Sequence, residues 1–209
     1  MKKFRTTRDV VTYLSTYISG DTLDFGAGGA KYRPLITPHT KTYTTFDMEA
    51  GEQIDVVGDA LNPPFEDNSF DTVIATQVLE HVEKPWVVVH EMKRILREGG
   101  TCIVTAPFLV PYHAYPTDFF RYTKEGMESL FTNEGFTIIE SDGYGNSLSM
   151  LGEMIRLSHF SNSRKVSRLR QWWRNLYTSL ISKIAYTSHD FFENDALYVN
   201  VYVVARKSK

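Results

Sequence analysis

The sequence predicts an α/β protein in which helices cover both faces of a seven-stranded, mostly parallel sheet. Short strand-like apolar runs alternate along the chain with longer segments of helical periodicity, and the connections between them are short. Residues 101–108, TCIVTAPF, are almost continuously apolar, as in a parallel strand that is covered on both faces. The 209 residues, of which 42% are hydrophobic and 23% charged, fit one soluble domain, 1–209, with a substantial core.

The first half of the chain supplies one helix and four strands. Residues 8–19 place Val10, Val11, Leu14 and Ile18 at helical spacing. The four expected strands are 22–25, 41–48, 53–60 and 69–76. All four are rich in β-branched or aromatic residues, which favour strands.

The second half continues the alternation. A helix over 87–98 buries one apolar face and is expected to stop at Gly99 and Gly100, because glycine accepts a left-handed cap easily. The strand 101–108 follows. The remaining expected elements are a helix within 123–136 and strands over 137–144 and 196–207.

Acidic residues and glycines follow three of the predicted strands. The stretch LDFGAGGAKYR, residues 23–33, has Asp24 in the first strand and then Gly26 and Gly28, which let the backbone approach a ligand closely. Asp47 ends the next strand, where a carboxylate can bind ribose hydroxyls, and Asp59 follows the third, placed for an adenine amino group. Carboxyl ends of parallel strands meet at one edge, so these residues predict a nucleotide site.

Four segments, in this order and spacing, resemble the motifs of class I S-adenosylmethionine-dependent methyltransferases: LDFGAGGAKY, TTFDME, VVGDALNPPFEDNSFDTVIATQVLEHV and ILREGGTCIVTAPF. The resemblance spans roughly 22–136 and implies a Rossmann-like fold with S-adenosyl-L-methionine as cofactor. It implies these contacts: Asp24, Gly26, Ala27 and Gly28 around the methionine part, Asp47 on the ribose, Met48 beside the adenine, Asp59 and Ala60 on its edge, and Thr76 lining the pocket. Ala30 departs from the usual third glycine of this family.

A nicotinamide-binding Rossmann domain is a weaker alternative. It prefers G-x-G-x-x-G, and Lys31 stands where the last glycine should be. That alternative also leaves Asp59 and the LEHV stretch without a role.

His81 and His113 are the candidate catalytic residues, since a hydroxyl acceptor profits from a general base. For His81, packing against the following helix is an equal alternative. The ubiquinone-biosynthesis O-methyltransferases resemble this stretch and hold a divalent ion with E-x-x-E-H, but Gln77 occupies the first position here. Glu80 and His81 alone are too few ligands, so no metal is expected.

The segment 107–123, PFLVPYHAYPTDFFRYT, is dense in proline, aromatic and polar residues and is expected to cover the substrate side. It resembles a P-x-H-x-x-P-x-D-x-x-R-[FY]-T pattern in a methyltransferase subgroup of surface-polysaccharide and other small-molecule pathways. Asp118 and Arg121 could also form an ion pair that shapes this loop. The candidate substrate residues are Tyr112, Tyr115, Asp118, Arg121 and Tyr122.

A basic segment precedes the last strand. Residues 154–189 contain seven Lys and Arg and no acid, although the whole chain has a net charge of −2. We expect a helical insertion over about 147–190 that packs on the core as a lid. The alternatives are a peripheral membrane contact through 164–188, arginines that neutralise substrate phosphates, and, less favoured, nucleic-acid binding.

These features together predict a cytoplasmic, or membrane-associated, S-adenosylmethionine-dependent O- or N-methyltransferase. A single cysteine, Cys102, fits a reducing compartment. The expected acceptor is a small molecule, with a sugar or lipid-linked intermediate of a cell-surface glycan pathway as one class. The alternative is a catalytically inactive cofactor-binding partner subunit or sensor.

Overall fold

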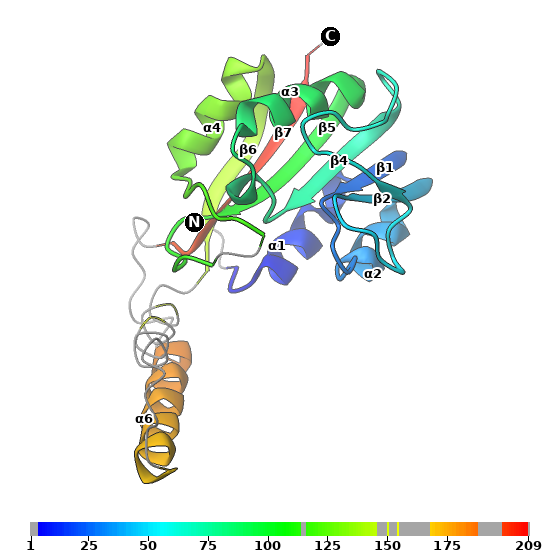
Figure 1. The fold of residues 1–209 in the computed structure, drawn as a ribbon. Helices are drawn as coiled ribbons and strands as arrows, with labels where there is room; N and C mark the ends of the chain where they lie inside the picture. The colour runs from blue at the N-terminus through cyan, green and yellow to red at the C-terminus, as the bar shows by residue number, and fades with distance from the viewer. Residues whose placement is uncertain are drawn as a thin grey trace.

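The computed structural model describes residues 4–113, 116–145, 150, 154, 168–187 and 198–208. It contains one seven-stranded sheet in the order β3-β2-β1-β4-β5-β7-β6 (Figure 1). β1 to β5 run parallel, and β7 is antiparallel to both of its neighbours. The strands are β1 Asp21–Phe25, β2 Thr42–Asp47, β3 Val56–Val57, β4 Phe70–Thr76, β5 Leu96–Pro107, β6 Phe136–Tyr144 and β7 Asn200–Lys207. The predicted fold class is therefore confirmed.

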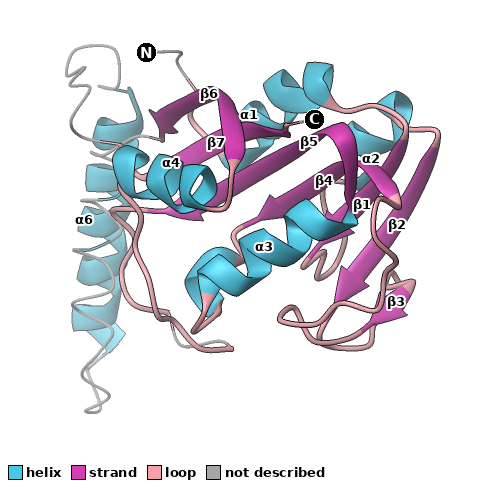
Figure 2. Ribbon diagram, turned by 90° about the horizontal axis from the view of Figure 1, so that it is seen from above, coloured by secondary structure: helices cyan, strands magenta, loops and turns pink. Residues whose placement is uncertain are grey.

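Helices cover both faces of this sheet (Figure 2). The α-helices are α1 Thr7–Leu14, α2 Arg33–Ile36, α3 Pro85–Ile95, α4 Lys124–Asn133 and α6 Arg168–Thr187, and the 3₁₀ turns are η1 Ser15–Tyr17, η2 Thr37–His39 and η3 Leu79–His81. α1 and α2 lie on one face, and α3 and α4 lie on the other. The short α2 was not predicted from the sequence.

The two faces bury separate apolar cores because successive strand residues point to opposite sides of the sheet. Val73 of β4 packs in the core beneath α3, whereas its neighbour Ile74 packs in the core beneath α1. Val104 and Ile103 of β5 repeat this division. Each such side chain stabilises the fold by roughly 1.5–3 kcal/mol, which holds the central strands and their carboxyl ends in register.

Polar contacts cap the first turn of α1 and fix the following turn η1 against the sheet. Thr6 and Asp9 form a reciprocal cap at its first turn, with the Thr6 amide donating to the Asp9 carboxylate at 2.9 Å. The carboxylate of Glu140 in β6 accepts hydrogen bonds from the hydroxyls of Tyr17 and Tyr202, both at 2.7 Å. The hydrogen bond to Glu140 raises the pKa of Tyr17 to about 12, so this hydroxyl stays a donor at neutral pH.

Two predicted boundaries are wrong. The helix expected over 87–98 ends at Ile95, because Leu96 already pairs with Phe70 as the first residue of β5. Residues 97–100 then bulge out before the regular pairing resumes at Thr101, and Gly99 takes its positive φ of 75° inside this bulge. The strand expected over 53–60 is only two residues long, Val56–Val57.

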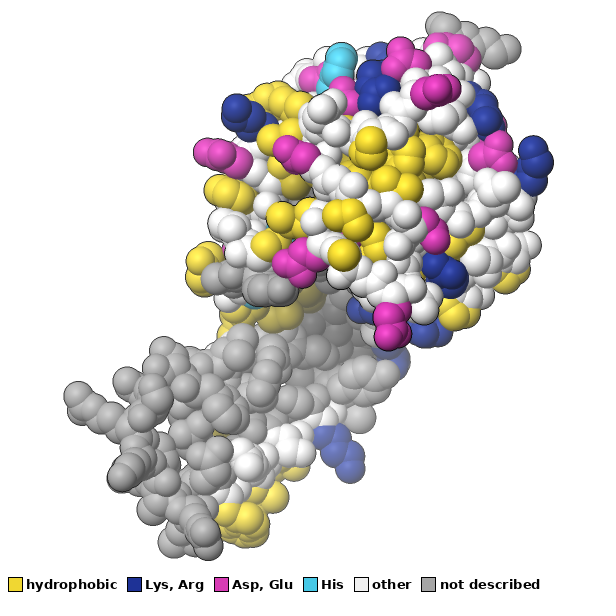
Figure 3. Space-filling view, turned by 45° about the vertical axis from the view of Figure 1, so that its right-hand side comes forward, with side chains coloured by type: hydrophobic (Ala, Val, Ile, Leu, Met, Phe, Trp, Pro, Cys, Tyr) yellow, Lys and Arg dark blue, Asp and Glu magenta, His cyan; other side chains and the backbone are white. Residues whose placement is uncertain are grey.

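α6 lies between β6 and β7 in the chain, within the predicted insertion of 147–190, most of whose other residues lie outside the described part. It stands apart from the helices that cover the sheet (Figure 1). Its apolar side chains are exposed, with Trp173 56% and Leu180 57% accessible. Some of this apolar surface is visible on the lower lobe in Figure 3. In the described part of the chain, no helix combines the length and the hydropathy that crossing a membrane requires.

Candidate functional site

The glycine loop after β1 is fastened to the end of β2. The amides of Gly26 and Ala27 both donate to the carbonyl of Phe46, at 2.8 and 3.0 Å. The amide of Gly28 donates to a carboxylate oxygen of Asp47 at 2.8 Å. The loop and Asp47 therefore form one hydrogen-bonded unit at the carboxyl edge of the sheet.

The backbone at Gly26 requires glycine. Its φ is +71°, and a Cβ there would lie 2.5 Å from Cγ2 of Val78, in the segment that follows β4. Gly28 also has a positive φ, +52°, but a Cβ at Gly28 would have no neighbour within 4 Å. The glycine at 26 thus permits close approach of two strand ends, whereas Gly28 leaves open space beside Asp47.

Asp24 lies below this loop rather than in a cavity wall. It is buried and accepts a hydrogen bond of 2.5 Å from the hydroxyl of Tyr43. Burial raises the pKa of Asp24 to about 6, although the hydrogen bond from Tyr43 and the charge of Arg33 oppose that rise. In this position Asp24 supports the base of the loop.

Two adjoining cavities, of about 270 and 450 Å³, open at this edge of the sheet. Their size is that of small-molecule sites. Both are lined by Met48, Ala60, His81 and Val82, so they form one continuous hollow. Residues lining only the first are Phe25, Gly26, Gly28, Phe46, Asp47, Glu49, Gln77, Val78 and Pro116, and residues lining only the second are Gly58, Asp59, Leu61 and Glu83.

Most of the predicted cofactor contacts meet around this hollow: Gly26, Gly28, Asp47, Met48, Asp59 and Ala60. Asp24, Ala27 and Thr76 do not line it. After β4 the wall comes instead from Gln77 and Val78, and Gln77 has a positive φ of 59° that turns the chain towards the cavity.

The turn η3 carries Glu80 and His81 and is bound to the segment 107–123. The amide of Phe119 donates to the carbonyl of Glu80 at 2.7 Å. Nδ1 of His81 lies 2.5 Å from the carbonyl oxygen of Thr117. These contacts place the loop after β5 directly over the end of β4.

The Glu80 side chain is fully buried in this region. Its two carboxylate oxygens have no hydrogen-bond partner among the residues that the structure describes. Burial raises the pKa of Glu80 to about 7, and the positive charge of Arg121 opposes that rise. A carboxylate held in this way attracts a proton or a cation.

Several predicted substrate residues instead shape the loop. Arg121 forms an ion pair with the buried Asp118 and donates to the carbonyls of Val110 and Pro111. This pairing lowers the pKa of Asp118 to about 2. A direct substrate role for Asp118 and Arg121 is therefore not supported by their contacts, whereas the predicted structural ion pair is present.

The tyrosines of this segment differ in position. Tyr122 is buried, its hydroxyl donates to the carbonyl of Leu79 at 3.0 Å, and it lines neither cavity, so its contact with substrate stays a prediction. Tyr112 is 74% exposed and lines neither cavity. Tyr115 lies outside the described residues.

The structure also brings together residues that the sequence analysis did not assign to the site. Phe25 and Phe46 form an apolar floor, and Pro116 contributes to the wall from the loop after β5. The sequence signal for Glu80 was its place before His81 in the stretch that resembles E-x-x-E-H. His113 lies close to both, with its ring centroid 5.0 Å from that of His81.

Known methyltransferases are similar to this chain over part of its length. Residues 23–104 match the family model of a methyltransferase domain. A demethylmenaquinone methyltransferase of Listeria welshimeri is 33% identical over 120 residues, covering 53% of this chain and 49% of the relative. An uncharacterized methyltransferase of Mycobacterium sp. strain KMS is 29% identical over 111 residues, covering 48% and 44%. The chain thus spans about half the length of these relatives.

Solved structures share the fold across nearly the whole chain. Phosphoethanolamine N-methyltransferase 2 of Haemonchus contortus, in complex with S-adenosyl-L-methionine, superposes with a TM-score of 0.59 at 17% identity, covering 97% of this chain and 52% of that one. The [4+2]-cyclase SpnF superposes with a TM-score of 0.61 at 17% identity, covering 97% and 80%. The architecture is therefore the Rossmann-like methyltransferase fold. It hosts more than one chemistry, so the site must decide the function.

The environment of Gly26 leads to a first prediction. We expect Gly26→Ala to lower the free energy of unfolding by roughly 2–3 kcal/mol, because a left-handed alanine is strained and its Cβ meets Val78. Gly29→Ala is the control, since its Cβ would meet nothing within 4 Å and its φ is not positive. Urea denaturation measures both variants. Equal free energies of unfolding for Gly26→Ala and Gly29→Ala would contradict the assigned role of Gly26.

The buried carboxyl of Asp24 leads to a second prediction. Its folded-state pKa of about 6 lies above the ordinary value near 4. As the pH rises through this range, the unfolded chain therefore loses the Asp24 proton before the folded chain does. This group therefore makes the folded state progressively less stable as the pH rises from about 4 to about 6. Asp24→Asn should remove that decline, on the order of 2 kcal/mol, when wild type and variant are compared by denaturation at pH 4.5 and 7. If the free energies of unfolding of wild type and Asp24→Asn change in parallel with pH, the raised pKa of Asp24 is refuted.

Proposed function

We propose that this chain is an S-adenosylmethionine-dependent methyltransferase that methylates a small molecule. The observation that carries the proposal is the junction of the glycine loop with Asp47 beside the hollow at the carboxyl edge of the sheet. The match of residues 23–104 to a methyltransferase domain and the shared architecture support it. The bound cofactor would supply an electrophilic methyl group on a sulfonium.

The lining residues fit this cofactor. Gly28 leaves open space where a Cβ would otherwise stand, and the carboxylate of Asp47 is held next to that space by backbone donors from Gly28 and Glu49. We assign Asp47 to the ribose hydroxyls and the exposed Met48 to one face of the adenine. Asp59, which also accepts from the Leu61 amide at 2.9 Å, and Ala60 are assigned to the adenine edge.

The acceptor is assigned to the side where η3 meets the loop after β5. His81 and Pro116 line the cavity there, and His113 lies beside His81. Methyl transfer is an in-line displacement, so the main task of these residues is to align the acceptor and exclude water. His81 and His113 are the groups available to take a proton from a hydroxyl or amine acceptor.

A second proposal concerns α6, which we assign to the surface of an anionic membrane. Trp173, Leu176, Leu180 and Ile184 recur every three or four residues and are all exposed, so they form one apolar stripe. The surrounding segment 154–189 carries seven basic residues and no acid. An amphipathic helix of this composition suits a lipid interface. Such a position would favour a lipid-linked acceptor, and several relatives are named for demethylmenaquinone.

A direct assay separates this enzyme from an inactive cofactor-binding subunit. The purified chain is incubated with methyl-labelled S-adenosylmethionine and a set of small-molecule acceptors, including sugar, phenol and quinol classes. Formation of S-adenosylhomocysteine together with a labelled product supports the proposal. Tight cofactor binding without transfer to any acceptor would favour the sensor alternative.

The contacts of Asp47 lead to a third prediction. Asp47→Ala should weaken binding of S-adenosylhomocysteine by about 1–3 kcal/mol, because polar groups of the ligand and the loop lose a partner. Glu52→Ala removes the same charge from an exposed residue that does not line the cavities and should bind normally. Calorimetry measures both. Unchanged affinity in Asp47→Ala would show that the ribose assignment is wrong.

The apolar stripe of α6 leads to a fourth prediction. The chain should sediment with phosphatidylcholine vesicles that contain phosphatidylglycerol and much less with phosphatidylcholine alone. Leu176→Ser combined with Leu180→Ser should abolish this difference, whereas Asn175→Ser, which lies outside the stripe, should preserve it. If wild type stays in solution with both vesicle types, α6 is not a membrane contact.

A further inference from the structure

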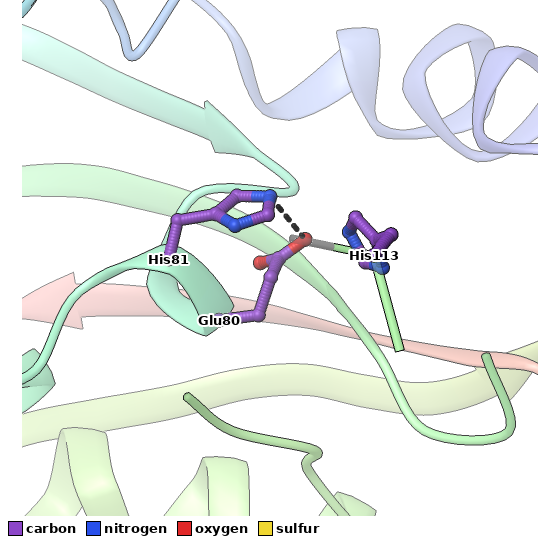
Figure 4. A group of neighbouring side chains, drawn as sticks. All are labelled: Glu80, His81 and His113. Atoms are coloured by element: carbon purple, nitrogen blue, oxygen red, sulfur yellow. Dashed lines mark ion pairs between the residues drawn. The ribbon is translucent and has the colours of Figure 1, made fainter. Parts of the chain in front are cut away.

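Three side chains with metal-ligand chemistry come together where η3 meets the loop after β5 (Figure 4). Glu80, His81 and His113 each offer one ligand atom, and these atoms all lie within 4.8 Å of one another. Nε2 of His81 lies 3.9 Å from a carboxylate oxygen of Glu80. The two imidazole rings are nearly perpendicular, at 88°, and they flank the Glu80 carboxylate from opposite sides (Figure 4).

The Glu80 carboxylate lacks the partner that a buried charge needs. It is completely inaccessible, and neither oxygen accepts a hydrogen bond from any residue in the described part of the chain. The guanidinium of Arg121 is the nearby cation, but its donors are directed to Asp118, to backbone carbonyls and, at 3.4 Å, to Nδ1 of His113 rather than to Glu80. Leaving a buried carboxylate unpaired costs several kcal/mol by general estimates, so a bound cation would stabilise this arrangement.

His81 is oriented as metal ligands usually are, and His113 can take the same arrangement. Nδ1 of His81 lies 2.5 Å from the carbonyl oxygen of Thr117, which can only accept, so this nitrogen carries the hydrogen. The lone pair is therefore on Nε2, the atom that is close to Glu80. Nδ1 of His113 lies 3.2 Å from the carbonyl oxygen of Pro111, where it can donate, and 3.4 Å from Nη2 of Arg121, from which it can accept, so metal binding through Nε2 selects the first arrangement. Ligating histidines commonly donate their second N–H to a backbone carbonyl in this way.

We propose that Glu80, His81 and His113 bind a divalent transition-metal ion of the zinc class. Two imidazole nitrogens and one carboxylate are a donor set for such ions, whereas calcium and magnesium prefer oxygen alone. Ligand atoms of a tetrahedral zinc site lie about 3.3 Å apart, so the three groups must draw together slightly. The partly exposed His113, at the edge of the loop, has room to make that movement.

This site revises the expectation that no metal binds. That expectation counted Glu80 and His81 only, and the structure adds His113 as a third donor from 32 residues further along the chain. His81 also lines both cavities, so the ion would lie in the wall of the hollow.

An oxygen of the acceptor could occupy an open position on the ion, which lowers the pKa of a bound hydroxyl. As ligands the histidines would not serve as general bases. Only this role in catalysis rests on the proposed function.

The binding test uses the full chain, stripped with chelator and dialysed, without cofactor or acceptor. We expect calorimetry to find one Zn²⁺ per chain and Co²⁺ to give the visible absorption of a low-coordinate site. His113→Ala and Glu80→Gln should each weaken Zn²⁺ binding at least about 100-fold. His90→Ala is the control, because this exposed histidine pairs with Glu134 away from the cluster.

Glu80→Gln is included because it should not disturb the fold: it replaces a buried charge by a neutral group of the same shape. A loss of Zn²⁺ binding in this variant therefore reports on the ligand and not on unfolding. A folded Glu80→Gln chain that binds Zn²⁺ as tightly as wild type would overturn the proposal. Loss of binding in His90→Ala, or no saturable binding in wild type, would also overturn it. Because no methyl transfer is measured, these outcomes are independent of whether the chain is a methyltransferase.

Discussion

The site depends on the hydrogen bonds that join the loop after β1 to the end of β2. Because β1 and β2 are parallel neighbours, their carboxyl ends lie side by side, and the Phe46 carbonyl can receive two amides from the loop. The same geometry lets Gly28 donate to Asp47. One set of contacts thus fixes the loop, orients the carboxylate and keeps the space beside them open. The apolar cores on both faces hold the strands that make these contacts possible.

A second junction, between η3 and the loop after β5, completes the hollow. Its polar residues divide into those that build the loop and those that remain free for chemistry. Arg121 and Asp118 satisfy each other and the surrounding carbonyls, and the Tyr122 hydroxyl is bound to Leu79. The Glu80 carboxylate, in contrast, has no hydrogen-bond partner among the described residues. A rigid frame of satisfied polar groups therefore surrounds one unsatisfied carboxylate, which is typical of a site prepared for a ligand.

Much of the architecture and of the glycine-loop side of the hollow could be predicted because it depends on local pattern. Periodicity identified all seven strands, and the spacing of Gly26, Gly28 and Asp47 placed these residues correctly along one edge. The helix end at Ile95 was missed because pairing of Leu96 with Phe70 overrides the glycine signal. The grouping of Glu80 with His113 depends on how the loop folds over η3, which residue types alone do not reveal. For the same reason, the sequence could not reveal that the Tyr122 hydroxyl is bound to the carbonyl of Leu79.

The place of β7 has a consequence for how the molecule assembles. β7 lies between β5 and β6, and in this sheet β6 has no other strand neighbour. β6 therefore cannot join the sheet until the ribosome has released β7, even though β6 is synthesised well before it. During that interval its hydrogen-bonding edge and the apolar face of α4 stay incompletely covered. The nascent chain is consequently most vulnerable to misassociation while the segment that contains α6 is being made.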